Sequence, residues 1–245
     1  ERINQLKRKI DRNNLLNKSE KNYLRKINFE NDYKILNKLN IIIVCLPTPV
    51  KRNKKPDLKL LKSASNIIGK NIKKNTTIIF ESTVYPGVTA QTWLPELEEI
   101  GLQIGVDVEI AYCPERFNPG DPSHGVRQVA RVIGCSNPDV GAGLVGLYSR
   151  LTSEDVRYVG KLEVAEAAKV IENVQRDINI ALVNELARIF PELDVDVEDV
   201  LSAAATKWNF HRYTPGVGVG GHCIPVDPYY MMQRAADVGV PAELI

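Results

Sequence analysis

The stretch that decides the fold is Asn40-Ile41-Ile42-Ile43-Val44-Cys45-Leu46-Pro47-Thr48-Pro49. It is a short run of β-branched apolar residues that ends in a proline-rich turn, and this pattern predicts a strand buried on both faces. A second run of this kind, Thr76-Thr77-Ile78-Ile79-Phe80, is followed by Glu81-Ser82-Thr83 and a Pro86-Gly87 turn. Residues 58–72, between the two runs, have helical periodicity. The order strand, helix, strand favours a parallel sheet covered by helices.

The same alternation continues toward residue 160. We predict further strands at residues 106–112, 130–133 and 156–159, and further helices at residues 89–100 and 138–149. Residues 1–38, ahead of the first strand, are polar and helix-prone. The predicted fold class is therefore α/β, with an incomplete Rossmann-like parallel sheet domain over residues 1–160.

A second, helical domain is predicted over residues 161–245. Residues 162–190 contain no glycine or proline and carry an apolar stripe at helical spacing, formed by Val164, Ala168, Ile171, Ile178, Leu182 and Leu186. A helix this long is about twice the usual length and often spans two domains or a dimer interface. Residues 194–205 predict another helix, residues 214–228 a loop rich in glycine and proline, and Tyr229 the start of a last helix.

The composition excludes several classes of protein. The 245 residues are 44% hydrophobic and 25% charged, which is typical of a soluble globular protein, and no apolar run approaches the length of a membrane helix. A net charge of +2 does not indicate a nucleic-acid partner. The four cysteines show no paired spacing, so we expect neither a disulfide framework nor a metal site. Free cysteines are typical of a reducing compartment, so we expect a cytoplasmic location.

Polar and turn residues follow three of the predicted strands. They are Pro47-Thr48-Pro49, Glu81-Ser82-Thr83 and Cys113-Pro114-Glu115-Arg116. Because ligands bind at the carboxyl ends of parallel strands, these three segments are candidates for one site. Alternatives stay open: the Ser82 and Thr83 hydroxyls fit turn capping equally well, and Glu115 fits a surface carboxylate. The thiols of Cys45 and Cys113 are more typical of small packed hydrophobes.

The helical domain offers two further candidates. Lys169 and Asn173 lie four positions apart on one helix face and would hold an oxygen anion if that face met the strand ends, although a solvated face with salt bridges explains them as well. The backbone N–H groups of the glycine-rich loop are suited to binding an anion. The loop leads to Cys223, whose thiol lies beside glycines and His222 in the sequence and is a candidate nucleophile.

Together these motifs resemble the UDP-glucose/GDP-mannose dehydrogenase family, over nearly the whole chain. The matching segments are Leu46-Pro47-Thr48-Pro49, residues 81–87, residues 113–120, Ala165-Glu166-Ala167-Ala168-Lys169 with Asn173, Asn184-Glu185-Leu186, and residues 215–230. Residues 81–87, 207–210 and 227–230 look most like the branch that oxidises UDP-N-acetylglucosamine or UDP-N-acetylgalactosamine. That branch makes the uronic acid used in surface polysaccharides.

The resemblance implies a double oxidation at C6, from alcohol to acid, with NAD as the cofactor. Cys223 matches the nucleophile, which would trap the aldehyde as a thiohemiacetal that is then oxidised to a thioester. Lys169 and Asn173 match the residues that stabilise oxygen anions. Asp227 and Thr83 match the pair that orders the hydrolytic water.

The resemblance also implies binding residues for cofactor and substrate. Glu115 matches a glutamate that acts as general base or activates water. The implied NAD contacts are Pro47, Thr48, Ser82 and Thr83. The implied contacts to the UDP-sugar are Glu115, Arg116, Lys169, Asn173, Tyr213, Gly216 and Gly220. No metal is implied, and the helix over residues 162–190 makes a homodimer the expected assembly.

This chain departs from the family pattern in several places. The UDP-glucose branch has a second acid where Pro119 stands and a lysine where Val226 stands, which favours the N-acetyl branch. No Gly-x-Gly-x-x-Gly precedes Ile41. The resemblance therefore implies that the first strand of the family lies before Glu1 and its C-terminal nucleotide-binding domain after Ile245, so that this chain is truncated at both ends.

Two other functions remain open at this stage. An inactive fragment that acts only as a dimerising scaffold would keep the same motifs. A relative of the β-hydroxyacid dehydrogenases would also place a lysine and an asparagine four positions apart on a helix, but it would oxidise its substrate once and would need no thiol.

Overall fold

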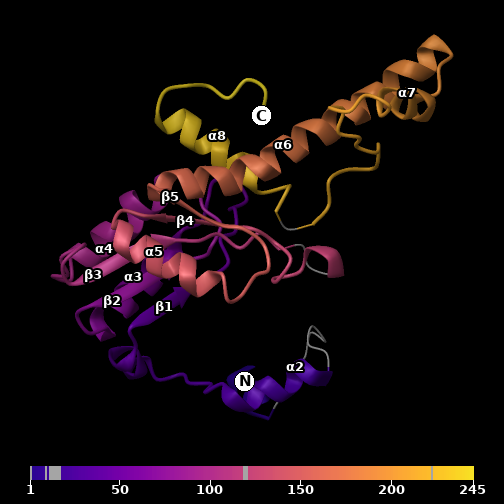
Figure 1. Cartoon of the computed structure of the whole chain (residues 1–245). Helices are drawn as coiled ribbons and strands as arrows, with labels where there is room; N and C mark the ends of the chain where they lie inside the picture. Colours follow the sequence, from indigo (N-terminus) through magenta and orange to yellow (C-terminus); the bar gives the residue numbers. More distant parts are fainter. Residues whose placement is uncertain (1, 9, 11–17, 118–120, 222) are drawn as a thin grey trace.

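The computed structural model describes residues 2–8, 10, 18–117, 121–221 and 223–245. The N-terminal part contains the short helices α1 (Arg2–Lys7) and α2 (Lys18–Tyr23), and the 3-10 helices η1 (Leu24–Lys26) and η2 (Tyr33–Lys38). Figure 1 shows α1 and α2, in indigo, on the side of the sheet away from the long helix.

A five-stranded sheet forms the centre of the molecule. Its strands are β1 (Ile41–Val44), β2 (Thr76–Phe80), β3 (Val108–Tyr112), β4 (Arg131–Cys135) and β5 (Val156–Gly160), in the spatial order β1-β2-β3-β4-β5. All five predicted strands are confirmed, and so is the α/β fold class.

The prediction of a wholly parallel sheet is wrong at one pair. β3 and β4 run antiparallel, whereas β1–β2, β2–β3 and β4–β5 are parallel. A parallel pair needs a crossover connection between its strands, and this connection is usually a helix. In the described residues between β3 and β4 the only helical element is the short η4 (Pro122–His124). The chain therefore enters β4 at the same end of the sheet at which it leaves β3, and the two strands run antiparallel.

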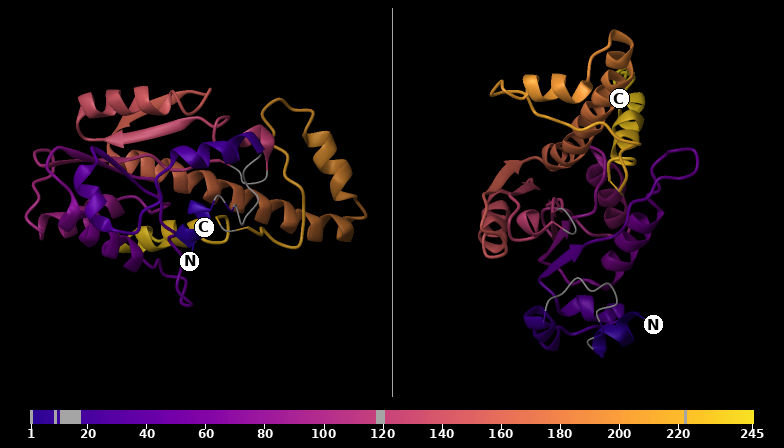
Figure 2. Two further views of the ribbon diagram at one scale, coloured as in Figure 1. Left: turned by 90° about the horizontal axis from the view of Figure 1, so that it is seen from below. Right: turned by 90° about the vertical axis from the view of Figure 1, so that its right-hand side faces the viewer.

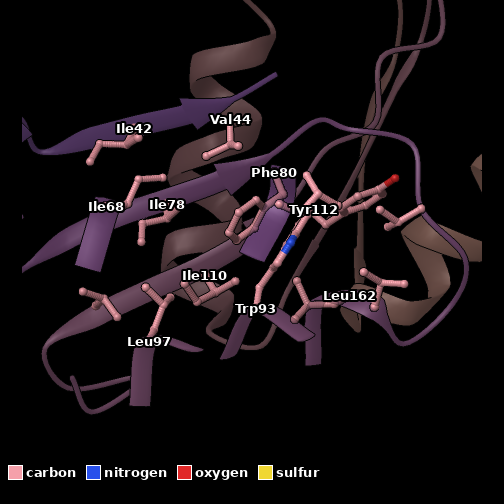
Figure 3. Packing of buried hydrophobic residues seen from close by; sticks show 14 of the residues in the cluster. Ile42, Val44, Ile68, Ile78, Phe80, Trp93, Leu97, Ile110, Tyr112 and Leu162 are labelled. Atoms are coloured by element: carbon pink, nitrogen blue, oxygen red, sulfur yellow. The ribbon is translucent and has the colours of Figure 1, made fainter. Parts of the chain in front are cut away.

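Helices cover both faces of the sheet. Helix α3 (Lys59–Asn71), the π-helical turn η3 (Thr89–Trp93) and α4 (Leu94–Glu98) pack on one face, where the Trp93 ring stacks on Phe80 with centroids 3.4 Å apart (Figure 3). On the other face, α5 (Pro138–Tyr148) covers Ile79 and Ile133. Neighbouring residues such as Ile78 and Ile79 enter different clusters because side chains alternate along a strand.

The sequence predicted that strand β1 is buried on both faces, and this prediction is wrong. Ile42 and Val44 are 7% and 5% exposed, but Ile41 and Ile43 are 43% and 44% exposed. β1 is one of the two edge strands of the described sheet, and its buried pair faces the cluster that α3 covers. An apolar run therefore predicts a strand but not the number of its faces that neighbouring elements cover.

The long helix α6 (Leu162–Ile189) links the sheet to the C-terminal part of the chain. Its buried residues lie between Leu162 and Val174, with Val183 as the exception. The second half runs beyond the sheet, and η5 (Phe190–Leu193) and α7 (Val197–Ala204) lie at its far end (Figures 1 and 2). Helix α8 (Asp227–Asp237) returns and packs on the first half of α6. No helix in the described ranges is long and apolar enough to cross a membrane.

Gly134 provides a test of how β4 and α6 fit together. A methyl group at this position would lie 2.7 Å from the Lys161 carbonyl oxygen and 2.8 Å from Leu162 Cα. Because these are backbone atoms, we expect Gly134→Ala to lower the free energy of unfolding by about 1–3 kcal/mol, as measured by urea denaturation. Gly143 is the matched control, since a methyl group there would have no neighbouring atom within 4 Å. Gly143→Ala in helix α5 is expected to raise stability slightly; equal effects of the two substitutions would contradict the packing described.

Candidate active site

A cleft of about 770 Å³ lies at the carboxyl ends of β1, β2 and β3. Residues after all three strands line it, together with residues of the loop before α8. The described lining is Cys45, Leu46, Pro47, Thr48, Pro49, Val50, Glu81, Ser82, Thr83, Glu115, Phe117, Cys223, Val226 and Asp227. The structure thus brings Cys223 to the three strand ends, although more than a hundred residues separate it from them in the sequence.

Helix α8 holds the Cys223 loop over the strand ends. The Tyr230 hydroxyl donates a hydrogen bond to the Thr48 carbonyl, and Tyr230 is fully buried. The backbone N–H groups of Val226 and Asp227 donate to the Cys223 carbonyl at 3.0 and 2.9 Å. Cys223 therefore closes the turn that leads into α8, and this turn holds the residue at the N-terminal end of the helix.

Two hydroxyls join the ends of β1 and β2. Thr48 Oγ1 donates to the Thr83 carbonyl at 2.6 Å, and Ser82 Oγ accepts from the Leu46 backbone N–H at 2.9 Å. These contacts join the two strand-end segments into one wall of the cleft. The sequence had left turn capping open for the Ser82 and Thr83 hydroxyls, and the Ser82 hydroxyl does bind the backbone, at the Leu46 N–H.

Lys169, Asn173 and Asp227 form a buried polar cluster beneath the cleft. Lys169 is 8%, Asn173 5% and Asp227 2% exposed, and Asn173 Nδ2 donates to Asp227 Oδ2 at 2.5 Å. Burial raises the pKa of Asp227, while the Asn173 hydrogen bond and the charge of Lys169 act against this rise. The alternative of a solvated, salt-bridged helix face is therefore wrong for Lys169 and Asn173.

Glu166 on the same helix is fully buried and fixes the turn after Thr83. Its carboxylate accepts from the backbone N–H groups of Gly87 at 2.6 Å and Thr89 at 2.9 Å, and from the Thr89 hydroxyl at 2.5 Å. Burial raises its pKa, and these three hydrogen bonds oppose the rise. Because Lys169 follows Glu166 by one helical turn, the contact sets the distance between Lys169 and the β2 end.

Glu115 lines the cleft but is extensively hydrogen-bonded. Its Oε1 accepts from the backbone N–H groups of Arg116 and Phe117, both at 2.8 Å, and its Oε2 accepts from Arg131 Nη2 at 2.8 Å. The guanidinium of Arg116 pairs with Glu172 on α6 at 2.6 Å and is not part of the described lining. The substrate contact expected of Arg116 therefore competes with an existing ion pair.

The four thiols differ in exposure. Burial raises the pKa of Cys45 to about 11 and that of Cys113 to about 12, and it also raises the pKa of Cys135. Cys113 and Cys135 are buried, whereas Cys45 and Cys223 are exposed to the cleft. The sequence had suggested that Cys45 packs as a small hydrophobe, and this prediction is wrong because Cys45 is exposed. The role of Cys223 as the nucleophile stays a prediction, and the exposure of its thiol to the cleft is compatible with it.

The glycine-rich loop lies apart from the described cleft lining. Tyr213, Gly216 and Gly220 do not line it, and the Gly216 N–H donates to Asn184 Oδ1 on α6 at 2.8 Å. Their expected contacts with the substrate stay predictions. His222 and Pro119, which also entered the sequence analysis, lie outside the described residues.

Sequence reasoning gave no role to two residues that support the cleft. Arg131 is 3% exposed and holds Glu115, and the Tyr148 hydroxyl donates to Glu81 at 2.5 Å. The sequence did contain a signal for the role of Arg131. An arginine at the start of a predicted buried strand indicates an anionic partner nearby, because a buried guanidinium needs one. Within the described ranges, no group of His, Cys, Asp and Glu side chains is arranged to hold a metal ion.

Comparison with known proteins places these features in a family. Residues 1–152 match the NAD binding domain of the UDP-glucose/GDP-mannose dehydrogenase family, and residues 163–245 match its central domain. The chain is 44% identical over 245 residues to a UDP-N-acetyl-D-glucosamine 6-dehydrogenase of Pseudomonas aeruginosa, and the match covers 100% of this chain and 58% of that protein. It is 40% identical over 245 residues to the protein of the same name from Salmonella typhi, covering 100% of this chain and 57% of the relative.

A solved structure agrees with the sequence matches. The UDP-D-ManNAc dehydrogenase from Pyrococcus horikoshii is similar with a TM-score of 0.85 and 28% identity, over 95% of this chain and 56% of that one. The predicted family resemblance is confirmed. The chain spans little more than half the length of the relatives that it matches.

Proposed function

The chain belongs to the UDP-glucose/GDP-mannose dehydrogenase family, and from this premise we propose that the whole protein is an NAD-dependent 6-dehydrogenase of a UDP-N-acetylhexosamine. The observation that carries the proposal is the cleft itself, where Cys223 and Asp227 lie with the ends of β1, β2 and β3. A thiol, a carboxylate and the strand ends of a nucleotide-binding sheet meet there, and oxidation through a thioester requires all three.

The proposed reaction has four steps at C6 of the sugar. The alcohol loses a hydride and a proton and becomes an aldehyde. The Cys223 thiolate adds to the aldehyde carbon, and the oxygen takes up a proton to give a thiohemiacetal. Loss of a second hydride and that proton leaves a thioester. Water then attacks the thioester carbon, the C–S bond breaks, and the acid and the free thiol are released.

The buried cluster beneath the cleft suits the charge that develops on the C6 oxygen. An ammonium group and an amide N–H, from Lys169 and Asn173, would stabilise an oxygen anion in a site from which burial removes water. Asp227, whose pKa burial raises, is the proposed acceptor of a proton from the hydrolytic water, with Thr83 as the second group that orders this water. Glu115 would orient water, because its hydrogen bonds fix both carboxylate oxygens.

The residues at the strand ends fit the nicotinamide half of NAD. Pro47, Thr48, Ser82 and Thr83 would hold it, since they line the same cleft as Cys223 and their backbone is fixed by the hydroxyl contacts between β1 and β2. When bound, NAD accepts the hydride in each oxidation. The loop over residues 213–220 is the proposed site of the UDP-sugar.

We also propose that two copies of the whole protein associate through α6. Beyond the sheet this helix exposes apolar side chains, including Leu182 at 52% and Ile189 at 44%, and burial of such side chains commonly stabilises a homodimer. The division into two domains near residue 160 and a cytoplasmic role in polysaccharide synthesis belong to the same proposal.

The test of the proposal is acid formation by the whole protein. We expect NADH to form with UDP-N-acetylglucosamine, UDP-N-acetylgalactosamine or UDP-N-acetylmannosamine, at two NADH per uronic acid, and the 245-residue chain alone to be nearly inactive. A panel of the three sugars and UDP-glucose, read by absorbance and mass spectrometry, identifies the substrate. Binding of two copies without NADH formation from any sugar would favour a dimerising scaffold instead.

A further inference from the structure

Three carboxylates line the described part of the cleft, and only Glu115 among them forms an ion pair within the described residues. Glu115 forms an ion pair with Arg131 at 2.8 Å, and Asp227 lies in the field of Lys169. The third, Glu81, has no ion-pair partner among the described residues. Its Oε1 accepts from the Tyr148 hydroxyl at 2.5 Å, and its Oε2 accepts from the Cys45 thiol at 3.6 Å.

Both hydrogen-bond partners of Glu81 are neutral at physiological pH. Burial raises the pKa of Cys45 to about 11 and also raises the pKa of Tyr148. The field of Arg131 reaches Glu81, but its guanidinium is bound to Glu115. Glu81 and Glu115 therefore share the single positive charge of Arg131, which leaves a net negative charge at the ends of β2 and β3 in a cleft open to a ligand.

The proposed reaction determines which ligand group meets this charge. A hydride passes between atoms in contact, so in the second oxidation the nicotinamide ring would have to lie beside the carbon bound to Cys223 Sγ. Cys223 and Glu81 line the same cleft, so a ring held beside Cys223 would lie in the field of Glu81. The oxidised ring carries a positive charge, and the reduced ring is neutral.

We propose that Glu81 is a specificity-determining residue that makes the cleft bind oxidised nicotinamide more tightly than reduced nicotinamide. This inference rests on the proposed function. A reaction that oxidises one sugar twice must exchange reduced for oxidised cofactor while the sugar stays attached to Cys223. A fixed negative charge promotes this exchange, because it weakens the retention of the reduced cofactor relative to the oxidised cofactor.

The test uses this chain and nicotinamide mononucleotide, which contains only the ring, ribose and one phosphate. The dissociation constants of its oxidised and reduced forms are measured by titration calorimetry. A unit charge about 6 Å away in a wet cleft changes an affinity by about threefold to tenfold. We expect Glu81→Gln to weaken binding of the oxidised form by this factor and to leave the reduced form nearly unchanged.

The matched control is Glu109→Gln. Glu109 lies on β3, accepts from Asn137 Nδ2 at 2.7 Å and does not belong to the described cleft lining. Its loss removes the same charge from the protein, so the ratio of the two affinities should stay that of the wild type. A salt titration of the wild-type chain supplies a readout that needs no variant, because screening should move the ratio toward one.

Two results would overturn the inference. One is an affinity ratio that is the same in the wild type and in Glu81→Gln and that salt does not change. The other is a wild-type chain that binds neither form of the mononucleotide. The proposed function is judged separately, since acid formation by the whole protein does not depend on this ratio.

Discussion

Cys223→Ser in the whole protein is expected to form the aldehyde but almost no acid. A serine hydroxyl is a far weaker nucleophile than a thiolate, so the second oxidation should slow by roughly 10³-fold or more. The first oxidation needs no thiol and should continue. The stoichiometry therefore falls from two NADH per sugar to one, which absorbance and mass spectrometry of the products measure together.

The comparison for this variant is Cys45→Ala, which removes the other exposed thiol of the cleft. The pKa of Cys45 is raised to about 11, so its thiol stays protonated and acid formation should persist. Loss of the acid product in Cys45→Ala and its retention in Cys223→Ser would mean that Cys45, and not Cys223, is the nucleophile. A single oxidation that is indifferent to both changes would instead fit a β-hydroxyacid dehydrogenase.

Lys169→Met is expected to slow both oxidations, by on the order of 10²- to 10³-fold. Methionine keeps much of the volume of the buried side chain but removes the ammonium group that would stabilise the C6 oxygen anion in each hydride transfer. The measurement is the rate of NADH formation from the UDP-sugar and, separately, from its 6-aldehyde.

The control is Lys59→Met, which removes a lysine from the exposed start of α3. It should leave both rates within about twofold, because surface substitutions rarely act at a distance. If Lys169→Met lowered only the rate from the aldehyde, Lys169 would act on the thiohemiacetal alone, and its proposed role in the first oxidation would be wrong.

The sequence predicted the elements of this fold well, because their signals are local. The run at Thr76 and the stripe on α6 predicted a strand and a helix within one or two residues of their observed bounds. The direction of β4 was not predicted, since it depends on the connection between two strands and not on either strand. The exposure of Ile41 and Ile43 was missed for a related reason, because burial is set by what packs on a face.

The site was predicted in part. The strand-end rule brought together Thr48, Thr83 and Glu115, which do share a cleft. No local pattern shows that Glu166 binds the backbone of residue 87, which lies 79 positions away, or that Arg131 binds Glu115. These contacts arise only when the elements pack, and the second of them gives the Glu115 carboxylate its cationic partner.

The central claim, that Cys223 forms a thioester with the sugar, is tested most directly by trapping that intermediate. The whole protein is mixed with the preferred UDP-N-acetylhexosamine and NAD, quenched in acid within the first turnovers, digested and analysed by mass spectrometry. We predict a UDP-sugar acyl adduct on the peptide that contains Cys223 and on no other cysteine peptide. Acid formation without any modification of Cys223 during turnover would contradict the claim.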